Sequence, residues 1–224
     1  RRPQDIARCL EAHGQLKNVK ECSMAITAWG RAGQWERALS LLEEMQSRGI
    51  EPDMIIFSAA ISACEKAGQC ERALALLEEM RTRGVEPDVV SFNAAISACE
   101  QCGEMAKAKL LYAQAVSLRF LPRMENGEID LHELAAPVAR VAVTWSLDCL
   151  ARGDTTLPDS GLRIITGKGN HSKDKVAVMK PAMEAMLASA GFAGLGATED
   201  EQNTGMLVVR AESFRAWAAA RHRD

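Results

Sequence analysis

Gly49-Ile50-Glu51-Pro52-Asp53 recurs as Gly84-Val85-Glu86-Pro87-Asp88, 35 residues further along the chain. Self-similarity at a fixed period of this size is typical of stacked-repeat proteins. If Val19, Met54 and Val89 are taken as first positions, glycine fills the fifteenth position of every unit and proline the thirty-fourth. These residues are Gly33, Gly68 and Gly103, and Pro52, Pro87 and Pro122.

Each unit is predicted to be a hairpin of two helices. Apolar residues follow a helical period before and after the central glycine, as in Ala73, Leu76, Leu77 and Met80. The glycine lets the chain turn after the first helix, and the proline prevents helical geometry from continuing past the end of the unit. Because one hairpin cannot bury its apolar face alone, the units should stack into a solenoid. The predicted units are 19–53, 54–88 and 89–123, and residues 1–18 are expected to be a partial or degenerate helical segment.

The composition is that of a globular protein. The 224 residues are 47% hydrophobic and 25% charged, with a formal net charge of −3. The longest apolar runs fall far short of the ~20 residues that a membrane-spanning helix needs, so no contact with a membrane is expected. Residues 1–123 carry 16 basic and 16 acidic side chains, and residues 124–224 carry 11 and 14. Nucleic-acid binding would therefore depend on local patches rather than on a strong overall positive field.

The repeats resemble the pentatricopeptide repeat (PPR) family, whose units are 35 residues long and have this glycine and a terminal Pro-Asp. The tetratricopeptide repeat is the alternative, but its Trp, Leu-Gly and Tyr pattern is absent. The resemblance implies a partner, single-stranded RNA, which the family reads one base per repeat through the fifth and last residues of each unit.

Carried onto this chain, the resemblance gives three reading pairs and a set of residues that pack between bases. The pairs are Ser23 with Asp53, Ser58 with Asp88, and Asn93 with Arg123. Serine with aspartate implies guanine, whereas Arg123 departs from the family pattern and leaves the third base unassigned. The second positions are Lys20, Ile55 and Val90, of which only Ile55 and Val90 fit the packing role. The alternative is purely structural: Ser58 and Asn93 would cap helices and the aspartates would close turns.

The second half of the chain has a different organisation. After a polar linker at 124–128, the 35-residue period stops and strands alternate with helices, which predicts an α/β domain at 129–224. The predicted strands are 129–133, 162–166 and 206–210, and the predicted helices are 135–152, 176–190 and 211–221.

Two groups of polar residues in this domain are candidates for chemistry. Asp130 and His132 are two apart in a predicted strand, so both should emerge on one face. The segment from Thr166 to Ser172 follows a strand and precedes a helix, and its glycines allow close approach of the backbone to a phosphate. Five basic residues and one aspartate lie between Arg163 and Lys180, a local balance of +4. The loop lacks the spacing of a Walker motif or a dinucleotide fingerprint, so neither ATP nor NAD is predicted.

Asp130-Leu131-His132 followed by Thr166-Gly167-Lys168-Gly169 resembles the small MutS-related (Smr) domain, and Asn170-His171-Ser172 is similar to the version fused to plant-type PPR arrays. The resemblance implies nucleic-acid binding, with nicking of DNA or cleavage of RNA in several members. It makes Asp130 and His132 the catalytic pair, and it places Gly167, Lys168, Gly169 and His171 against the nucleic acid. A divalent cation such as Mg²⁺, held at Asp130, is an alternative to direct acid–base catalysis, and no other metal site is expected. Glu133 stands where the family has glycine, which brings a negative charge to the site.

The sequence thus predicts an α-helical solenoid of PPR hairpins followed by an α/β Smr domain. The leading hypothesis is an RNA-binding protein of a chloroplast or mitochondrion whose second domain binds, and in one version cleaves, the RNA; the organelle is implied by the family resemblance alone. One alternative is a non-catalytic protein-interaction scaffold. Another is a DNA-nicking Smr nuclease. In a third, Asp130 pairs locally and His132 is a partly buried ring without catalytic function.

Overall fold

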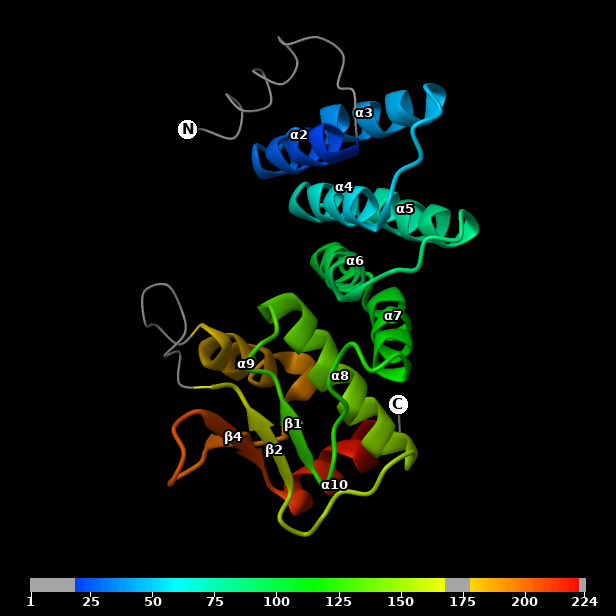
Figure 1. Cartoon of the computed structure of the whole chain (residues 1–224). Helices are drawn as coiled ribbons and strands as arrows, with labels where there is room; N and C mark the ends of the chain where they lie inside the picture. Colours follow the sequence, from blue (N-terminus) through cyan, green and yellow to red (C-terminus); the bar gives the residue numbers. More distant parts are fainter. Residues whose placement is uncertain (1–18, 168–177, 222–224) are drawn as a thin grey trace. The chain divides into compact units, whose positions relative to one another are not determined.

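The computed structural model describes residues 19–167 and 178–221. The chain divides into two compact units, Arg1–Leu111 and Tyr112–Asp224. Within the described residues, six helices of equal length precede a mixed sheet with its helices (Figure 1). None of the helices in 19–167 or 178–221 is long and apolar enough to cross a bilayer.

The six helices form three hairpins in the predicted register. The members, in order, are α2 (Val19–Arg31), α3 (Trp35–Ser47), α4 (Met54–Lys66), α5 (Cys70–Thr82), α6 (Val89–Gln101) and α7 (Met105–Ser117). Gly68 follows α4 with φ +67° and its successor Gln69 donates its N–H to the carbonyl of Cys64, 2.9 Å away. This left-handed closure is the conformation that glycine adopts without strain, and it reverses the chain into the second helix.

The first helices of successive repeats pack against one another, α2 on α4 and α4 on α6. A β-carbon built on Gly30 would lie 2.8 Å from Cβ of Ala63, so α2 and α4 approach as closely as their backbones allow. The core between them is made of small and branched side chains, including Ile26, Ile61 and Ile96, each 0% exposed. The low aromatic content of the chain therefore matches helices that lie close together.

The second unit is built on a four-stranded sheet in the order β1-β2-β4-β3. Strand β1 pairs with β2 in parallel, and β4 is antiparallel to both β2 and β3. The strands are β1 (Glu128–Asp130), β2 (Leu162–Ile165), β3 (Thr198–Glu199) and β4 (Met206–Val209). The helices are α8 (Ala136–Arg152), α9 (Met179–Leu187), the short 3-10 helix η1 (Ala190–Phe192) and α10 (Ala211–Arg221).

The observed elements differ from the predicted ones mainly at three places, and several other ends shift by one residue. The first strand ends at Asp130 instead of Glu133, because the chain turns toward α8 directly after Leu131. The predicted helix 176–190 ends at Leu187 and its start falls partly outside the described residues. Between residues 191 and 205, where the sequence predicts neither helix nor strand, the chain forms β3, a two-residue exposed strand that is too short to show alternation.

Candidate nucleic-acid interface

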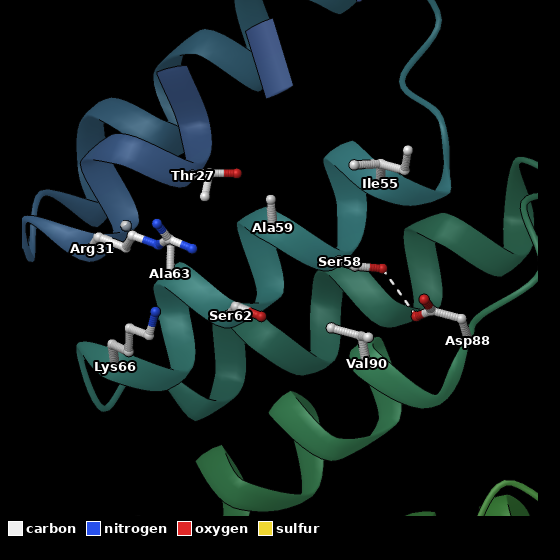
Figure 2. Close-up of a pocket in the computed structure, with 11 residues that line it drawn as sticks. Thr27, Arg31, Ile55, Ser58, Ala59, Ser62, Ala63, Lys66, Asp88 and Val90 are labelled. Carbon is white, nitrogen blue, oxygen red and sulfur yellow. Dashed lines mark hydrogen bonds between the residues drawn. The ribbon is translucent and has the colours of Figure 1, made fainter. Parts of the chain in front are cut away.

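A groove of about 360 Å³ lies in the first unit, lined mainly by the first helices of the repeats (Figure 2). Residues of α2, α4 and α6 contribute to it, together with Asp88 in front of α6. Because the first helices stack in order, the same repeat position recurs along the groove. The groove contains the second repeat's predicted reading residues, Ser58 and Asp88, and the two predicted packing residues, Ile55 and Val90.

Ser58 and Asp88 are brought together by the fold. The Ser58 hydroxyl lies 3.0 Å from Asp88 Oδ1 and 2.8 Å from the carbonyl oxygen of Met54. Asp88 is also the N-cap of α6, where Oδ1 accepts from the Ser91 N–H at 2.9 Å. In the described part of the chain, Asp88 Oδ2 has no hydrogen-bond partner. The pair therefore presents a positioned carboxylate oxygen that can accept a hydrogen bond from a ligand.

The other two pairs are arranged differently. Asp53 caps α4 through the N–H of Ile56, 3.0 Å away, and forms no hydrogen bond with Ser23 in the part of the chain that the structure covers. The side-chain oxygen Oδ1 of Asn93 is buried and has no hydrogen-bond partner among the described residues. Ser58 and Asn93 are each the fifth residue of a helix and do not cap one, whereas Asp53 and Asp88 do act as caps. The aspartates thus have a structural role in addition to any contact with a ligand.

Ile55 and Val90 are apolar side chains exposed to solvent, at 59% and 49%. They lie on either side of Ser58 and Asp88 in the groove wall (Figure 2). An exposed branched side chain beside a polar pair offers a surface against which a flat ring can pack. This arrangement fits the predicted role of these two residues between bases.

Two cations in the groove were not anticipated from the sequence. Arg31 and Lys66 occupy the thirteenth position of the first and second repeats, and both line the groove. Figure 2 shows their side chains at the end of the groove away from Asp88. Neither makes an ion pair with any residue of 19–167 or 178–221. The recurrence of a basic residue at the same repeat position is the sequence signal that could have identified them as groove residues.

A second candidate site lies at the edge of the sheet in the other unit. Asp130 ends β1, and His132 follows it on the same side of the chain. Ile129, before the pair, and Leu131, between its two members, are buried at 1% and 0% exposure. His132 Nδ1 lies 2.6 Å from Asp130 Oδ1, and the His132 backbone N–H donates to the same oxygen at 3.1 Å. The predicted pair is therefore formed, and it leaves His132 Nε2 as the ring nitrogen that faces away from Asp130.

The surrounding charges raise the pKa of His132 above its ordinary value. The main cause is the hydrogen bond with Asp130, and the negative charges of Asp130 and Glu133 act in the same direction. Glu133 Oε1 lies 3.6 Å from His132 Nε2. The side chains of His132 and Asp130 are about half exposed, at 47% and 48%, so both can be reached from solvent. The ring is thus protonated over a wider pH range than an isolated histidine, which favours proton donation.

The glycine loop begins beside this pair. A β-carbon on Gly167, where φ is +73°, would lie 3.1 Å from Cβ of His132. The carbonyl of Gly205 accepts from the N–H groups of Thr166 and Gly167, at 2.8 and 3.1 Å, and so fixes where the loop leaves β2. The fold therefore brings the start of the predicted phosphate-binding loop beside the Asp130–His132 pair at one edge of the sheet. Lys168, Gly169 and His171 lie outside the described residues.

The sheet edge that carries Asp130 and His132 offers few side chains that could bind a metal cation. Within 19–167 and 178–221 no three His, Cys, Asp or Glu side chains gather in a way that could hold a metal ion. Asp130 Oδ1 is engaged by His132, so Oδ2 is the oxygen left to contact a hydrated Mg²⁺. A divalent cation at Asp130 therefore remains an expectation from the sequence.

Comparison with known proteins gives both family matches and similar structures. The pentatricopeptide repeat domain profile matches residues 40–101, and the PPR repeat profile matches 22–50 and 90–120. The crystal structure of the pentatricopeptide repeat protein PPR10 from maize is similar with a TM-score of 0.52 and 27% identity, over 67% of this chain and 22% of that one. The structure of PPR10 in complex with an 18-nt psaJ RNA element has a TM-score of 0.48 and 23% identity, over 67% and 20%.

A curated relative is the Smr domain-containing protein C11H11.03c of Schizosaccharomyces pombe (strain 972 / ATCC 24843), 38% identical over 76 residues, which are 34% of each chain. This chain therefore spans about a third of that relative and about a fifth of PPR10.

The first unit is thus a helical-repeat array of the solenoid class. The helical hairpins are pentatricopeptide repeats, matched continuously from residue 22 to residue 120, so the last of them ends in the second unit.

Proposed function

We propose that this protein binds single-stranded RNA through its pentatricopeptide repeats. The observation that carries the proposal is the Ser58–Asp88 pair, hydrogen bonded in a groove that also contains exposed Ile55 and Val90 and the cations Arg31 and Lys66. Single-stranded nucleic acid is bound by such a combination of positive charge for the backbone and flat or apolar surfaces for the bases.

The chemistry of the pair favours guanine at the second repeat. The Watson–Crick edge of guanine carries two neighbouring N–H donors, and Asp88 Oδ2 is an acceptor without a partner in the described part of the chain. Ile55 and Val90 would pack on the faces of the base, and Lys66 and Arg31 would lie near phosphates. Exchanging Ser58 for Asn should move the preference at one base from guanine toward uracil, as the family pattern implies.

Equilibrium binding tests this function directly. Filter binding of the full chain to single-stranded RNA, single-stranded DNA and duplex RNA should be measured at one salt concentration, because phosphate contacts make affinity depend strongly on salt. Preferential retention of single-stranded RNA is expected. Negligible retention of all three would contradict RNA binding and favour the alternative, a protein-interaction scaffold. Preferential retention and nicking of DNA would favour the DNA-nicking alternative.

A second candidate function, cleavage of the bound RNA, is supported by the Asp130–His132 pair. The pair lies at the carboxyl ends of two parallel strands, β1 and β2, where α/β sheets commonly bind their ligands. The match to an Smr domain-containing relative adds support for an Smr domain in this chain. In this proposal the residues from Gly167 onward hold a phosphate close to His132.

His132 Nε2 is the atom that would move a proton. Asp130 fixes the ring through Nδ1 and stabilises the imidazolium form, so His132 would donate its Nε2 proton to the oxygen that leaves as a water or a neighbouring ribose hydroxyl attacks the scissile phosphate and releases its own proton to solvent. Glu133 strengthens this preference because its charge also raises the His132 pKa. It would at the same time repel an approaching phosphate, which predicts slow cleavage for the wild-type chain.

The test of cleavage separates it from binding. Wild-type protein should shorten a bound single-stranded RNA, whereas Asp130→Asn and His132→Ala should bind it with unchanged affinity and leave it intact. Equal cleavage by the wild-type and both variants would assign the activity to another site or to a contaminant. Residence in a chloroplast or mitochondrion is proposed on the family resemblance, and fractionation of cells that produce the full-length protein would test it.

A further inference from the structure

Two departures from the repeat pattern introduce arginine near the end of the third repeat. Gly49 and Gly84 follow the second helices of the first two repeats, and the third repeat has Arg119 at this position. Asp53 and Asp88 end the first two repeats, and the third ends with Arg123. Relative to the pattern, the two changes add three units of positive charge over five residues.

Arg119 is held in a backbone conformation suited to glycine. Its φ is +61°, close to +70° and +73° at Gly49 and Gly84. The closure is the same as in the second repeat, because Phe120 N–H donates to Ala115 at 2.9 Å as Val85 N–H donates to Met80 at 2.9 Å. A side chain in this region is strained, and such strain is often retained where the side chain serves a function.

Both arginines line one cavity of about 990 Å³. All the residues that line it belong to the second unit, from the end of α7, the segment that follows it, α8 and the residues just after α8. Tyr112 donates its hydroxyl to the carbonyl of Pro122 at 2.6 Å and its ring lies 5.5 Å from that of Trp145, so the chain just before Arg123 is fixed against α8.

The acidic side chains that the structure describes in the cavity wall do not form ion pairs with Arg119 or Arg123, so both guanidinium groups can bind a ligand. Arg152 is paired with Asp154 at 2.8 Å, and Glu125 is the other acidic side chain in the wall. Arg119 and Arg123 make no ion pair with any residue that the structure describes. Trp145, which is partly exposed, gives the same wall an aromatic ring.

Ser146 adds an unsatisfied polar group to this wall. Its side chain is 1% exposed, and its hydroxyl has no hydrogen-bond partner among the described residues. A buried hydroxyl without a protein partner is uncommon in folded proteins, and Ser146 therefore has a hydrogen bond to offer in the cavity wall.

We propose that this cavity binds a phosphorylated nucleoside, either a free mononucleotide or a terminal nucleotide of an RNA strand. Arg119 and Arg123 bind the phosphate, since both line the cavity and a guanidinium group can donate two parallel hydrogen bonds to phosphate oxygens. Trp145 packs against the base, as aromatic side chains do in single-strand binding sites. The inference goes beyond the proposed function, because a cavity confined to the second unit does not depend on base reading by the repeats.

The test is a titration of the full chain with adenosine 5′-monophosphate and uridine 5′-monophosphate, followed by the indole N–H signal of Trp145 in ¹⁵N NMR spectra. Trp145→Phe assigns the signal. Adenosine and inorganic phosphate are titrated separately to measure the contribution of each part. A short RNA with a 5′-phosphate, compared with its 5′-hydroxyl form, distinguishes a strand end from a free nucleotide as the source.

The variants restore the repeat pattern. Arg119→Gly and Arg123→Asp should each raise the nucleotide Kd at least about tenfold, because each removes a charge-assisted contact. Arg119→Gly suits the local backbone, so a loss of binding there cannot be attributed to misfolding. Arg215→Gln, in the same unit and outside the cavity, should leave the Kd unchanged. Lys66→Gln should weaken RNA binding by the repeats without changing the mononucleotide Kd.

Three results would overturn the inference. The first is a Trp145 signal that does not move at millimolar nucleotide. The second is a nucleotide Kd that is the same in the wild type, Arg119→Gly and Arg123→Asp. The third is inorganic phosphate binding as tightly as the mononucleotides, which would remove the nucleoside from the proposal.

Discussion

The hydroxyl of Ser58 lies 3.0 Å from Asp88 Oδ1, the same oxygen that caps α6. One carboxylate therefore links the fifth residue of the second repeat to the start of the third. The helix cap and the proposed base recognition therefore depend on the same side chain, and the choice of substitution separates the two.

Replacing Asp88 should affect folding and binding differently. Asp88→Ala removes the cap and should lower the free energy of unfolding by about 1 kcal/mol, whereas Asp88→Asn keeps a good capping residue and should change it by only a few tenths of a kcal/mol. Both should weaken binding of a guanine-containing RNA, since both lose the carboxylate. Denaturant unfolding and RNA binding of the two variants check this. An Asp88→Asn variant that binds guanine as well as the wild type would contradict the reading role.

Lys66 should contribute to RNA binding through charge. Replacing it with glutamine should weaken binding to all single-stranded sequences by a similar factor and reduce the slope of log Kd against log salt concentration by about 0.7, the value for one phosphate contact on a single strand. Lys107→Gln is a control of the same charge change, because Lys107 is occupied by Glu71 at 2.7 Å. Unchanged salt dependence in Lys66→Gln would exclude it as a phosphate contact.

The His132 pKa is a direct measure of the candidate catalytic pair. An NMR titration should give a pKa above the ordinary 6.5, and Asp130→Asn should lower it more than Glu133→Gln, because the hydrogen bond with Asp130 is the main cause of the shift. Since the pKa is raised on folding, the stabilising contribution is complete below pH ~6.5 and is lost as the pH rises through the folded-state value. Any cleavage that depends on protonated His132 should decline over the same range. A pKa at or below 6.5 would contradict the pairing.

The repeat register could be predicted from the sequence because it is local and recurs. Glycine at the turn, proline at the end and apolar residues at helical spacing each act within one unit, and the hairpins begin at Val19, Met54 and Val89 as the register requires. Asp130 and His132 could be paired because residues two apart in an extended chain share a face. The pairing persists although the strand ends at Asp130.

Contacts between distant segments could not be predicted in this way. The family resemblance pairs Ser58 with Asp88, but nothing local to Ser58 indicates that its hydroxyl forms a hydrogen bond with that carboxylate, thirty residues away. The approach of Gly167 to His132 also depends on the pairing of β1 with β2. The strand β3 was missed because two exposed residues carry no periodic signal.

The left-handed backbone at Arg119 should reduce the stability of the folded protein. Arg119→Gly should raise the free energy of unfolding of the second unit by about 1 kcal/mol, because the left-handed conformation is strained for a residue with a side chain. Gly84→Arg places the same side chain at the matching position of the second repeat, where φ is +73°, and should lower stability by a similar amount. A β-carbon at Gly84 meets no atom within 4 Å, so the loss would come from the backbone and not from a clash. Thermal and denaturant unfolding of both variants, compared with the wild type, measure the two effects. If Arg119→Gly destabilises the protein, contacts of the arginine side chain outweigh its backbone strain, and the matching Gly84→Arg variant shows how large that strain is.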